Sequence, residues 1–456
     1  MLVKELRQGL RARTFIAVFL ALQIMLGIML LFASASDASD RAGSVVSGMI
    51  FTFFAIAVLI VQPLRGVAAI ASEIKSNTIE MMVLTRLSAW RIVYGKWVAI
   101  VSQSALILIT IIPYLILRYF FGGMNLVGEI VFLSLIFLTS MALTALTVGL
   151  SGSSSGVIRA LIPLVATPVM FFGMIGLTFG GASRNLIESC SLDDREAIIG
   201  IVFYIISIVY LGWSSLTLGA SLIAPAAENH STLRRCITLF LLISLMLVTL
   251  FYSLQKEAVV LLMMVIVAPA LVLALTESPR IVPLHDQGVG KNKPVRRIFR
   301  LFLQPGLAAG IFFSAGVGAL VACITFLHPD IAKDQEMHLL ILALFGAFLL
   351  PAVVQSFTFK TDAQRIANYI LLMVGSCILT VILATLSQAI VNREFLWLFV
   401  WNPLVFIIME SRSEFDGPDL LLALLIVNAV FIILLFIKAF MVMKAHRELV
   451  SRSAIK

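Results

Sequence analysis

Long apolar runs, separated by short polar segments, make up most of the chain. A helix needs about 20 apolar residues to cross a bilayer, and many of these runs approach or exceed that length. The runs do not alternate with a period of two, as the strands of a membrane barrel do. Helices satisfy their backbone hydrogen bonds internally, which hydrocarbon requires. The pattern therefore predicts an all-α fold, a polytopic bundle of transmembrane helices.

We expect about twelve spans, six in each half of the chain. The first set is 15–32, 45–61, 97–117, 127–150, 157–179 and 198–223. The second set is 236–254, 258–276, 306–327, 339–359, 366–391 and 420–440. A further apolar run, 395–409, is shorter than a typical span, which predicts a re-entrant or surface-lying helix on the outer face. The predicted domains are residues 1–230 and 231–456.

Composition supports the same class. The 456 residues are 61% hydrophobic and only 12% charged, and the mean hydropathy is +1.08. A soluble domain of this size needs a mostly polar exterior, which so few charged side chains do not supply. The lipid bilayer is therefore the expected surrounding of the chain.

The basic residues set the expected orientation. If the N-terminus is cytoplasmic and 395–409 does not cross, most of the 33 lysines and arginines fall on the cytoplasmic side. We therefore expect both termini in the cytoplasm. The net charge of +9 is then an orientation signal, and it gives no indication of nucleic-acid binding.

The first residues predict an amphipathic elbow helix ahead of the first span. Leucines fall on one helical face, and the basic side chains Lys4, Arg7, Arg11 and Arg13 fall off it. A basic start and an apolar core are also features of a signal peptide, but the apolar run is long enough to span and further spans follow. A simple basic tail that holds the N-terminus inside is an equally good interpretation of these charges.

The stretch 70–97 is unusually charged for a link between two spans. Asn77 and Glu80 have the spacing of a capping box, and Ser88 is placed to cap a second helix start. A short capped helix between spans is a place where a soluble partner could act on a membrane protein.

This stretch resembles the cytoplasmic loop of type-2 ABC exporter permeases, a family of bacterial drug, polysaccharide, heme and ion exporters. The residues that carry the resemblance are Glu73, Thr78, Ile79, Glu80, Met82, Val83, Thr85, Ser88, Gly95 and Lys96. Asn77 stands where the family prefers Gly, and Arg86 stands where it prefers Pro. The resemblance covers residues 1–230, where an elbow and six spans match the core of the family.

The resemblance implies a coupling helix at about 72–96 that binds a separate ABC ATPase subunit. Ile79, Met82 and Val83 would supply adaptable apolar contacts, and Glu73 and Glu80 would face a basic groove. Lys96 would anchor the third span at the lipid headgroups. For Glu80 alone, simple capping of helix amides is an equally good interpretation.

The family resemblance also implies a bacterial inner (plasma) membrane location. No ATPase motif is expected in this chain, because Gly288-Val289-Gly290-Lys291-Asn292 lacks the P-loop spacing and hydroxyl. ATP would be bound by the partner, so the chain itself is expected to be a transport subunit with no cofactor and no enzymatic activity.

Residues 231–456 predict a second six-span bundle, and 277–304 does not repeat the charged loop of the first half. This half is either a diverged second permease or, in our preferred interpretation, an accessory bundle. A complete exporter would then need a homodimer or a second permease chain.

Catalytic and metal-binding constellations are not expected. The histidines and the four cysteines lie apart along the sequence, without ligand spacing. Glu129 and Glu257 fall at span edges, whereas a proton-coupled carrier needs an acid near mid-depth. A secondary transporter and a non-catalytic membrane scaffold remain the alternative hypotheses.

Overall fold

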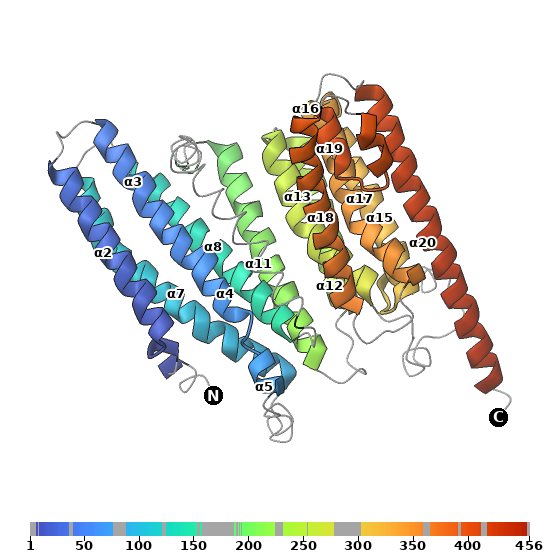
Figure 1. Cartoon of the computed structure of the whole chain (residues 1–456), viewed down its shortest axis with the longest axis horizontal. Coiled ribbons are helices and arrows are strands. Elements are labelled where there is room, and N and C mark those ends of the chain that lie inside the picture. Colours follow the sequence, from blue (N-terminus) through green and yellow to red (C-terminus); the bar gives the residue numbers. More distant parts are fainter. Residues whose placement is uncertain are drawn as a thin grey trace. The chain divides into compact units, whose positions relative to one another are not determined.

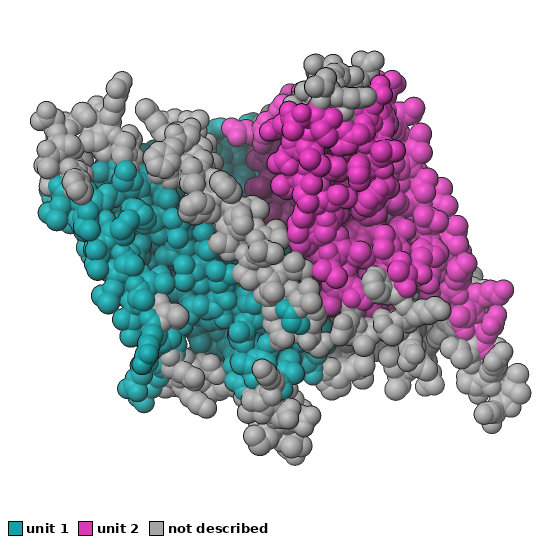
Figure 2. All heavy atoms as spheres, viewed as in Figure 1, with its two compact units in different colours: residues 1–226 teal, residues 227–456 magenta. Residues whose placement is uncertain are grey.

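The computed structural model describes most of the chain. The described residues are 6–7, 9–35, 40–75, 88–120, 125–152, 156, 187, 190, 192, 194–223, 231–252, 254–277, 302–358, 365–390, 394–411 and 417–453. Every regular element among them is a helix, so the predicted all-α class is confirmed. Two compact units divide the chain, Met1–Ala226 and Ala227–Lys456 (Figure 2).

The first unit is built from long, roughly antiparallel helices (Figure 1). They are α2 (Arg13–Ala35), α3 (Asp40–Ala55), η1 (Ile56–Val61), α4 (Gln62–Gly66), α5 (Ala71–Lys75), α7 (Ala89–Tyr119), α8 (Leu126–Ser151) and α11 (Arg195–Ile223). Helix α8 begins at Asn125, whose side-chain oxygen accepts from the Gly128 amide at 3.1 Å. Ser88 does precede α7 in an extended conformation, but its side chain forms no capping hydrogen bond.

A π-helical segment interrupts the second span of the first unit. Helices α3 and α4 are joined by η1, where the backbone winds in wider turns. The hydroxyl of Ser140 on α8 donates to the carbonyl of Val58 at 2.6 Å. A polar side chain from a neighbouring helix therefore bonds the backbone within the irregular turn.

Apolar side chains fill the interior of the first unit. Leu26, Ile50, Phe54 and Ile107 are fully buried in one cluster that joins α2, α3 and α7. Helices α8 and α11 approach through glycine: a Cβ on Gly219 would lie 2.8 Å from the Gly149 Cα. Small residues allow this close backbone approach, which van der Waals packing rewards in lipid.

The second unit holds a further set of helices. They are α12 (Ser231–Phe251), α13 (Lys256–Thr276), α15 (Leu307–Leu327), α16 (Pro329–Ala332), α17 (Gln335–Thr358), α18 (Arg365–Ala389), η3 (Glu394–Phe399), α19 (Val405–Glu410) and α20 (Gly417–Ser453). Arg235 on α12 pairs with Glu277 at 2.7 Å and donates to the carbonyls of Phe302 and Gln304. The buried guanidinium group thus ties the end of α13 to the segment that leads into α15.

Ten helices among the described residues are long and apolar enough to cross a membrane. Helix α2 adds a shorter apolar stretch, Phe15–Leu31. The expected span 157–179 lies outside the described residues. The chain is therefore a multi-pass membrane protein, with ten spans identified against the twelve expected.

The apolar run 395–409 forms two short helices, η3 and α19, of six residues each. Neither reaches the ~30 Å that a span requires, in agreement with the expectation that this run does not cross. Asn402 lies between them, fully buried, and its amide donates to the Ser376 carbonyl and the Thr380 hydroxyl at 3.1 and 3.0 Å. These bonds hold the turn against α18. Its position on the outer face stays a prediction.

The contact between α8 and α11 generates a paired prediction. Gly149→Ala should lower the free energy of unfolding by about 1–3 kcal/mol, because the new Cβ collides with the Ser215 carbonyl oxygen. Gly200→Ala, on the partner helix α11, should be neutral or stabilising by up to about 1 kcal/mol, because nothing lies within 4 Å of a Cβ at that position. Thermal unfolding of the detergent-solubilised chain measures both. Equal effects at the two positions would contradict the proposed contact.

Candidate functional site

The segments on both sides of residues 76–87 rest on one hydrophobic cluster at an end of the first unit. Ile70 precedes the segment and is fully buried, and Val93 follows it and is also fully buried. Val148 on α8 and Leu216 and Ala220 on α11 complete the same cluster. In Figure 1, α5 and the start of α7 lie together at this end. The described residues before and after 76–87 therefore meet in one cluster.

An ion pair joins α5 and α7, the helices on either side of residues 76–87. The Lys96 ammonium on α7 lies 3.1 Å from a carboxylate oxygen of Glu73 on α5. The Lys96 side chain is 6% exposed and that of Glu73 is 21% exposed. Both residues were singled out in the sequence for separate roles, at headgroups and at a partner. The structure pairs them with each other, and their contacts with headgroups and with a partner stay predictions.

A hydroxyl joins the same region to the end of α8. The Ile70 amide donates to the Ser151 hydroxyl oxygen at 3.1 Å, and this hydroxyl donates to the Val148 carbonyl at 2.6 Å. Ser151 is the last residue of α8. The chain just before α5 is therefore hydrogen-bonded to α8, whose neighbour α11 is packed against it through Gly149 and Gly219.

Aromatic residues surround the start of α7. Trp90 and Tyr94 stack with ring centroids 6.2 Å apart, and Tyr94 and Trp97 lie 5.4 Å apart. The Trp97 ring nitrogen donates to the Met141 carbonyl at 2.9 Å. Tryptophan and tyrosine gather at the boundary between hydrocarbon and water. This end of α7 therefore has the side chains of a membrane interface.

The elbow residues fit an amphipathic start. Arg7, Arg11 and Arg13 are exposed, whereas Leu6 and Leu10 are half-buried. Leu10 packs against the apolar core of the first unit. Lys4 lies outside the described residues. The exposed basic side chains are in the arrangement predicted from the sequence, and their contact with lipid stays a prediction.

Arg65 connects the elbow to the spans. Its guanidinium group donates to Gln103 on α7, to the Gln62 side chain at 3.2 Å and to the Gly9 carbonyl at 3.4 Å. It also lies 5.7 Å from the centre of the Phe15 ring. One cation therefore joins α4, α7 and the residues before α2.

Four of the ten predicted coupling residues are described: Glu73, Ser88, Gly95 and Lys96. Glu73 and Lys96 meet, whereas Ser88 is exposed and only marks the start of α7. A Cβ on Gly95 would meet nothing within 4 Å, so packing does not require glycine there. The other six, Thr78, Ile79, Glu80, Met82, Val83 and Thr85, lie outside the described residues.

A second buried ion pair was missed in the sequence. The Arg118 guanidinium lies 3.4 Å from a Glu129 carboxylate oxygen, and both side chains are at most 3% exposed. Ser47 accepts from Arg118 at 2.6 Å and donates to Glu129 at 2.9 Å. Glu129 does stand in the first turn of α8, as its edge position predicted, but its side chain turns inward. The signal for this pair in the sequence was a basic residue at the end of one span and an acidic residue at the start of the next.

The two ion pairs mark the two ends of α7. Lys96 and Arg118 are separated by about 33 Å along the helix axis, since each residue adds about 1.5 Å. This distance is close to the ~30 Å thickness of the hydrocarbon core. The two ion pairs are therefore separated by about the thickness of the hydrocarbon core, and most of the apolar part of α7 lies between them.

Neither a protein-family model, nor a curated protein, nor a solved structure matches the chain. The resemblance to type-2 permeases therefore depends on the residues of the loop and on the order of the spans.

The Glu73–Lys96 pair generates the next prediction. Lys96→Met should lower the free energy of unfolding by about 1–3 kcal/mol, because it leaves the largely buried Glu73 carboxylate without this cation. Glu73→Gln in the Lys96→Met background should restore part of that loss. Arg91→Met is the matched control, since Arg91 is an exposed cation five residues earlier on α7, and it should change stability by less than about 0.5 kcal/mol. Denaturant titration measures the cycle, and additive effects would contradict the pairing.

Proposed function

We propose that the chain is the membrane-spanning subunit of an ATP-driven exporter, with residues 72–96 as the helix that couples it to a separate ATPase chain. The protein is a multi-pass helical membrane protein, as its apolar helices show. The observation that supports the finer proposal is that the described segments before and after residues 76–87 meet, through Ile70 and Val93 in one cluster and through the Glu73–Lys96 pair.

This arrangement would allow a movement of residues 76–87 to be transmitted to several transmembrane helices. A force on residues 76–87 reaches α7 through the Lys96 ammonium and α8 through the Ser151 hydroxyl. It then reaches α11 through the glycine contact at Gly149 and Gly219. Movements of an ATPase subunit would thereby be shared among several spans.

The proposal also specifies the assembly. The charged loop occurs once in the sequence, and 277–304 lacks its Thr-x-Glu pair. An exporter needs a second coupled permease unit, so a second copy of this chain or another permease would supply it. The proposed location is the bacterial inner membrane.

One observation favours a secondary transporter as the second candidate. Glu129 is a buried acid that pairs with Arg118 within the first unit, and buried charges in membrane proteins often belong to ion pathways. Its position in the first turn of α8, near one membrane boundary, fits a structural pair better than a mid-depth relay. Cargo movement that follows a proton gradient and persists after ATP depletion would favour this candidate.

The coupling helix is tested by affinity purification of the tagged full chain from its native membranes, followed by identification of P-loop-bearing proteins. Wild type should retain an ABC ATPase, and Glu80→Lys or deletion of residues 78–84 should reduce its recovery at least tenfold. The reason is that a reversed charge or a missing segment removes the proposed docking contacts.

The matched control is Glu196→Lys, the same charge reversal in the first turn of α11. This position lies about 40 Å along α11 from the cluster end. It should leave ATPase recovery unchanged while the chain stays monodisperse. Equal recovery with wild type and with the 78–84 deletion would overturn the proposed function.

A further inference from the structure

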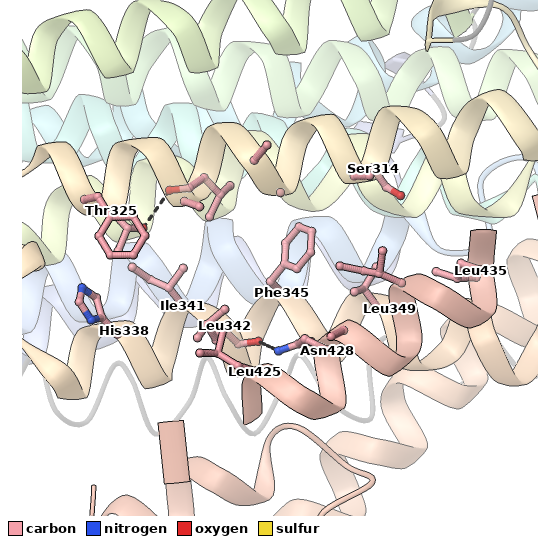
Figure 3. A pocket seen from close by; sticks show the side chains of 18 of the residues that line it. Ser314, Thr325, His338, Ile341, Leu342, Phe345, Leu349, Leu425, Asn428 and Leu435 are labelled. Carbon is pink, nitrogen blue, oxygen red and sulfur yellow. Dashed lines mark hydrogen bonds between the residues drawn. The ribbon is translucent and has the colours of Figure 1, made fainter. Parts of the chain in front are cut away.

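The second unit contains an apolar cavity that the proposed ATPase contact does not involve. Its volume is about 400 Å³, within the range of sites that hold small ligands. Helices α15, α17 and α20 line it (Figure 3). All of these helices belong to the second unit, so the occupancy of the cavity can be tested apart from the coupling region.

Small side chains on one face of α15 leave this space open. The lining residues of α15 recur at helical spacing, and most of them are small: Ser314, Ala315, Gly318, Ala319 and Ala322. The residues opposite are larger, such as Phe345 on α17 and Leu425 on α20 (Figure 3). Because the small residues fill little of the space between the helices, a void remains that the side chains of the protein do not occupy.

The cavity extends along the helices from one end of the spans toward their middle. Its lining begins at Phe326 near the end of α15 and at His338 near the start of α17, and these two rings lie 5.8 Å apart. It continues to Ile311 and Leu349, which corresponds to about 16–22 Å along the two helices. Half of a ~30 Å hydrocarbon core is about 15 Å. The cavity therefore has the depth of one leaflet, from the boundary to about the middle of the bilayer.

The cavity is open on one side and closed at its deep end. Ala319 on α15 and Leu425 and Ala429 on α20 line it and are exposed. At the deep end the Phe312 ring lies 5.3 Å from the Phe436 ring, so α15 and α20 are in contact there. An occupant can therefore enter sideways between α15 and α20, and the contact of the two rings limits how deep it reaches.

Three of the four polar side chains in the lining form hydrogen bonds within the protein. Ser314 and Thr325 donate to carbonyls of their own helix. The Asn428 nitrogen donates to the Leu342 carbonyl at 3.1 Å, and its oxygen lies against Gly346, which is outside the lining. A buried water usually needs two to four polar partners. The walls of the cavity therefore suit hydrocarbon better than water.

Acyl chains of the bilayer match this site in chemistry and in place. An empty apolar cavity leaves its lining atoms without van der Waals partners on one side, and a hydrocarbon chain supplies them. The surrounding lipid presents such chains at the depth of the opening, because α15, α17 and α20 are long and apolar enough to cross the hydrocarbon. A head group at the boundary end of the cavity allows one chain to extend along its whole length.

We propose that the cavity holds one acyl chain of a phospholipid from the leaflet at the α16 end of the second unit. The head group stays at the boundary near His338. The chain enters between α15 and α20, and its methyl end lies toward Leu435, at the other end of the cavity in Figure 3. The lipid thereby completes the packing between three helices that the side chains of the protein leave incomplete.

Photoactivatable phosphatidylcholines test this proposal on the full chain in lipid nanodiscs. One probe carries a diazirine at the methyl end of an acyl chain, the other carries it beside the ester, and mass spectrometry locates the labelled residues. The methyl-end probe should label Ile432, which lies deep in the lining, at least as strongly as Ile433, its exposed neighbour outside the lining. The ester-side probe should label Leu421, near the boundary, at least tenfold more strongly than Ile432.

Two results on wild type would overturn the proposal. In the first, the methyl-end probe labels Ile432 less than one tenth as strongly as Ile433, which means that only the lipid around the protein is sampled. In the second, the order of the two probes along the cavity is reversed, which means that the chain does not come from the leaflet at the α16 end.

A matched pair of variants locates the chain. Ala315→Phe fills the deep part of the cavity and should lower methyl-end labelling of Ile432 at least tenfold, with Ile433 unchanged. Cys323→Phe places the same ring on α15 at an exposed position outside the lining, and it should leave both unchanged. If Ala315→Phe is not monodisperse, Ala319→Leu at the opening makes the same comparison. Labelling of Ile432 that survives the filling variant contradicts the assigned site.

Discussion

Hydrocarbon offers no partner to a backbone amide or carbonyl, and this constraint governs both units. It explains why the described elements are helices and why polar side chains also bond within the protein. Ser102 and Thr139, for example, return their hydroxyls to the carbonyls of Val98 and Leu135, one turn earlier on the same helix. Asn402 and Arg235 follow the same rule with backbone carbonyls of neighbouring segments. Some polar side chains are thus satisfied within their own helix, whereas others, such as Asn402 and Arg235, join neighbouring segments.

The same constraint explains why the two buried cations of α7, Lys96 and Arg118, are each paired with a carboxylate. A charge that enters low-dielectric surroundings needs an opposite charge and further hydrogen bonds. Arg118 and Glu129 obtain these through Ser47, and Lys96 obtains an opposite charge from Glu73. Helix α7 is thereby held near both of its ends, by Glu73 at Lys96 and by Glu129 at Arg118. A span fixed in this way is well placed to carry a displacement from one side of the bilayer to the other.

Much of the fold could be predicted from the sequence, because a membrane span is a local signal. The run length alone located the helices α7, α8 and α13, and the brevity of 395–409 predicted that it would not cross. Which side chains pair across neighbouring helices is not determined by the local sequence. The burial of Glu129 and the pairing of Glu73 with Lys96 depend on which helix ends come together, and a single sequence does not contain that information. The cavity was invisible for the same reason, since its wall combines small residues of α15 with the amide of Asn428 on α20.

The π-helical turn at Ile56–Val61 has a consequence for the angular phase of the second span. An α-helix rotates by about 100° per residue, and a π turn accommodates an additional residue, so the faces before and after it are no longer in one α-helical register. Ser47 reaches the ion pair at one end, while Arg65 and Ile70 point to the elbow and to the cluster at the other. One residue fewer in this turn would rotate one end against the other by about a quarter of a circle. The π-helical turn therefore fixes the rotation of one part of this span relative to the other. Ser47 can then bond the Arg118–Glu129 pair while Arg65 bonds the residues before α2.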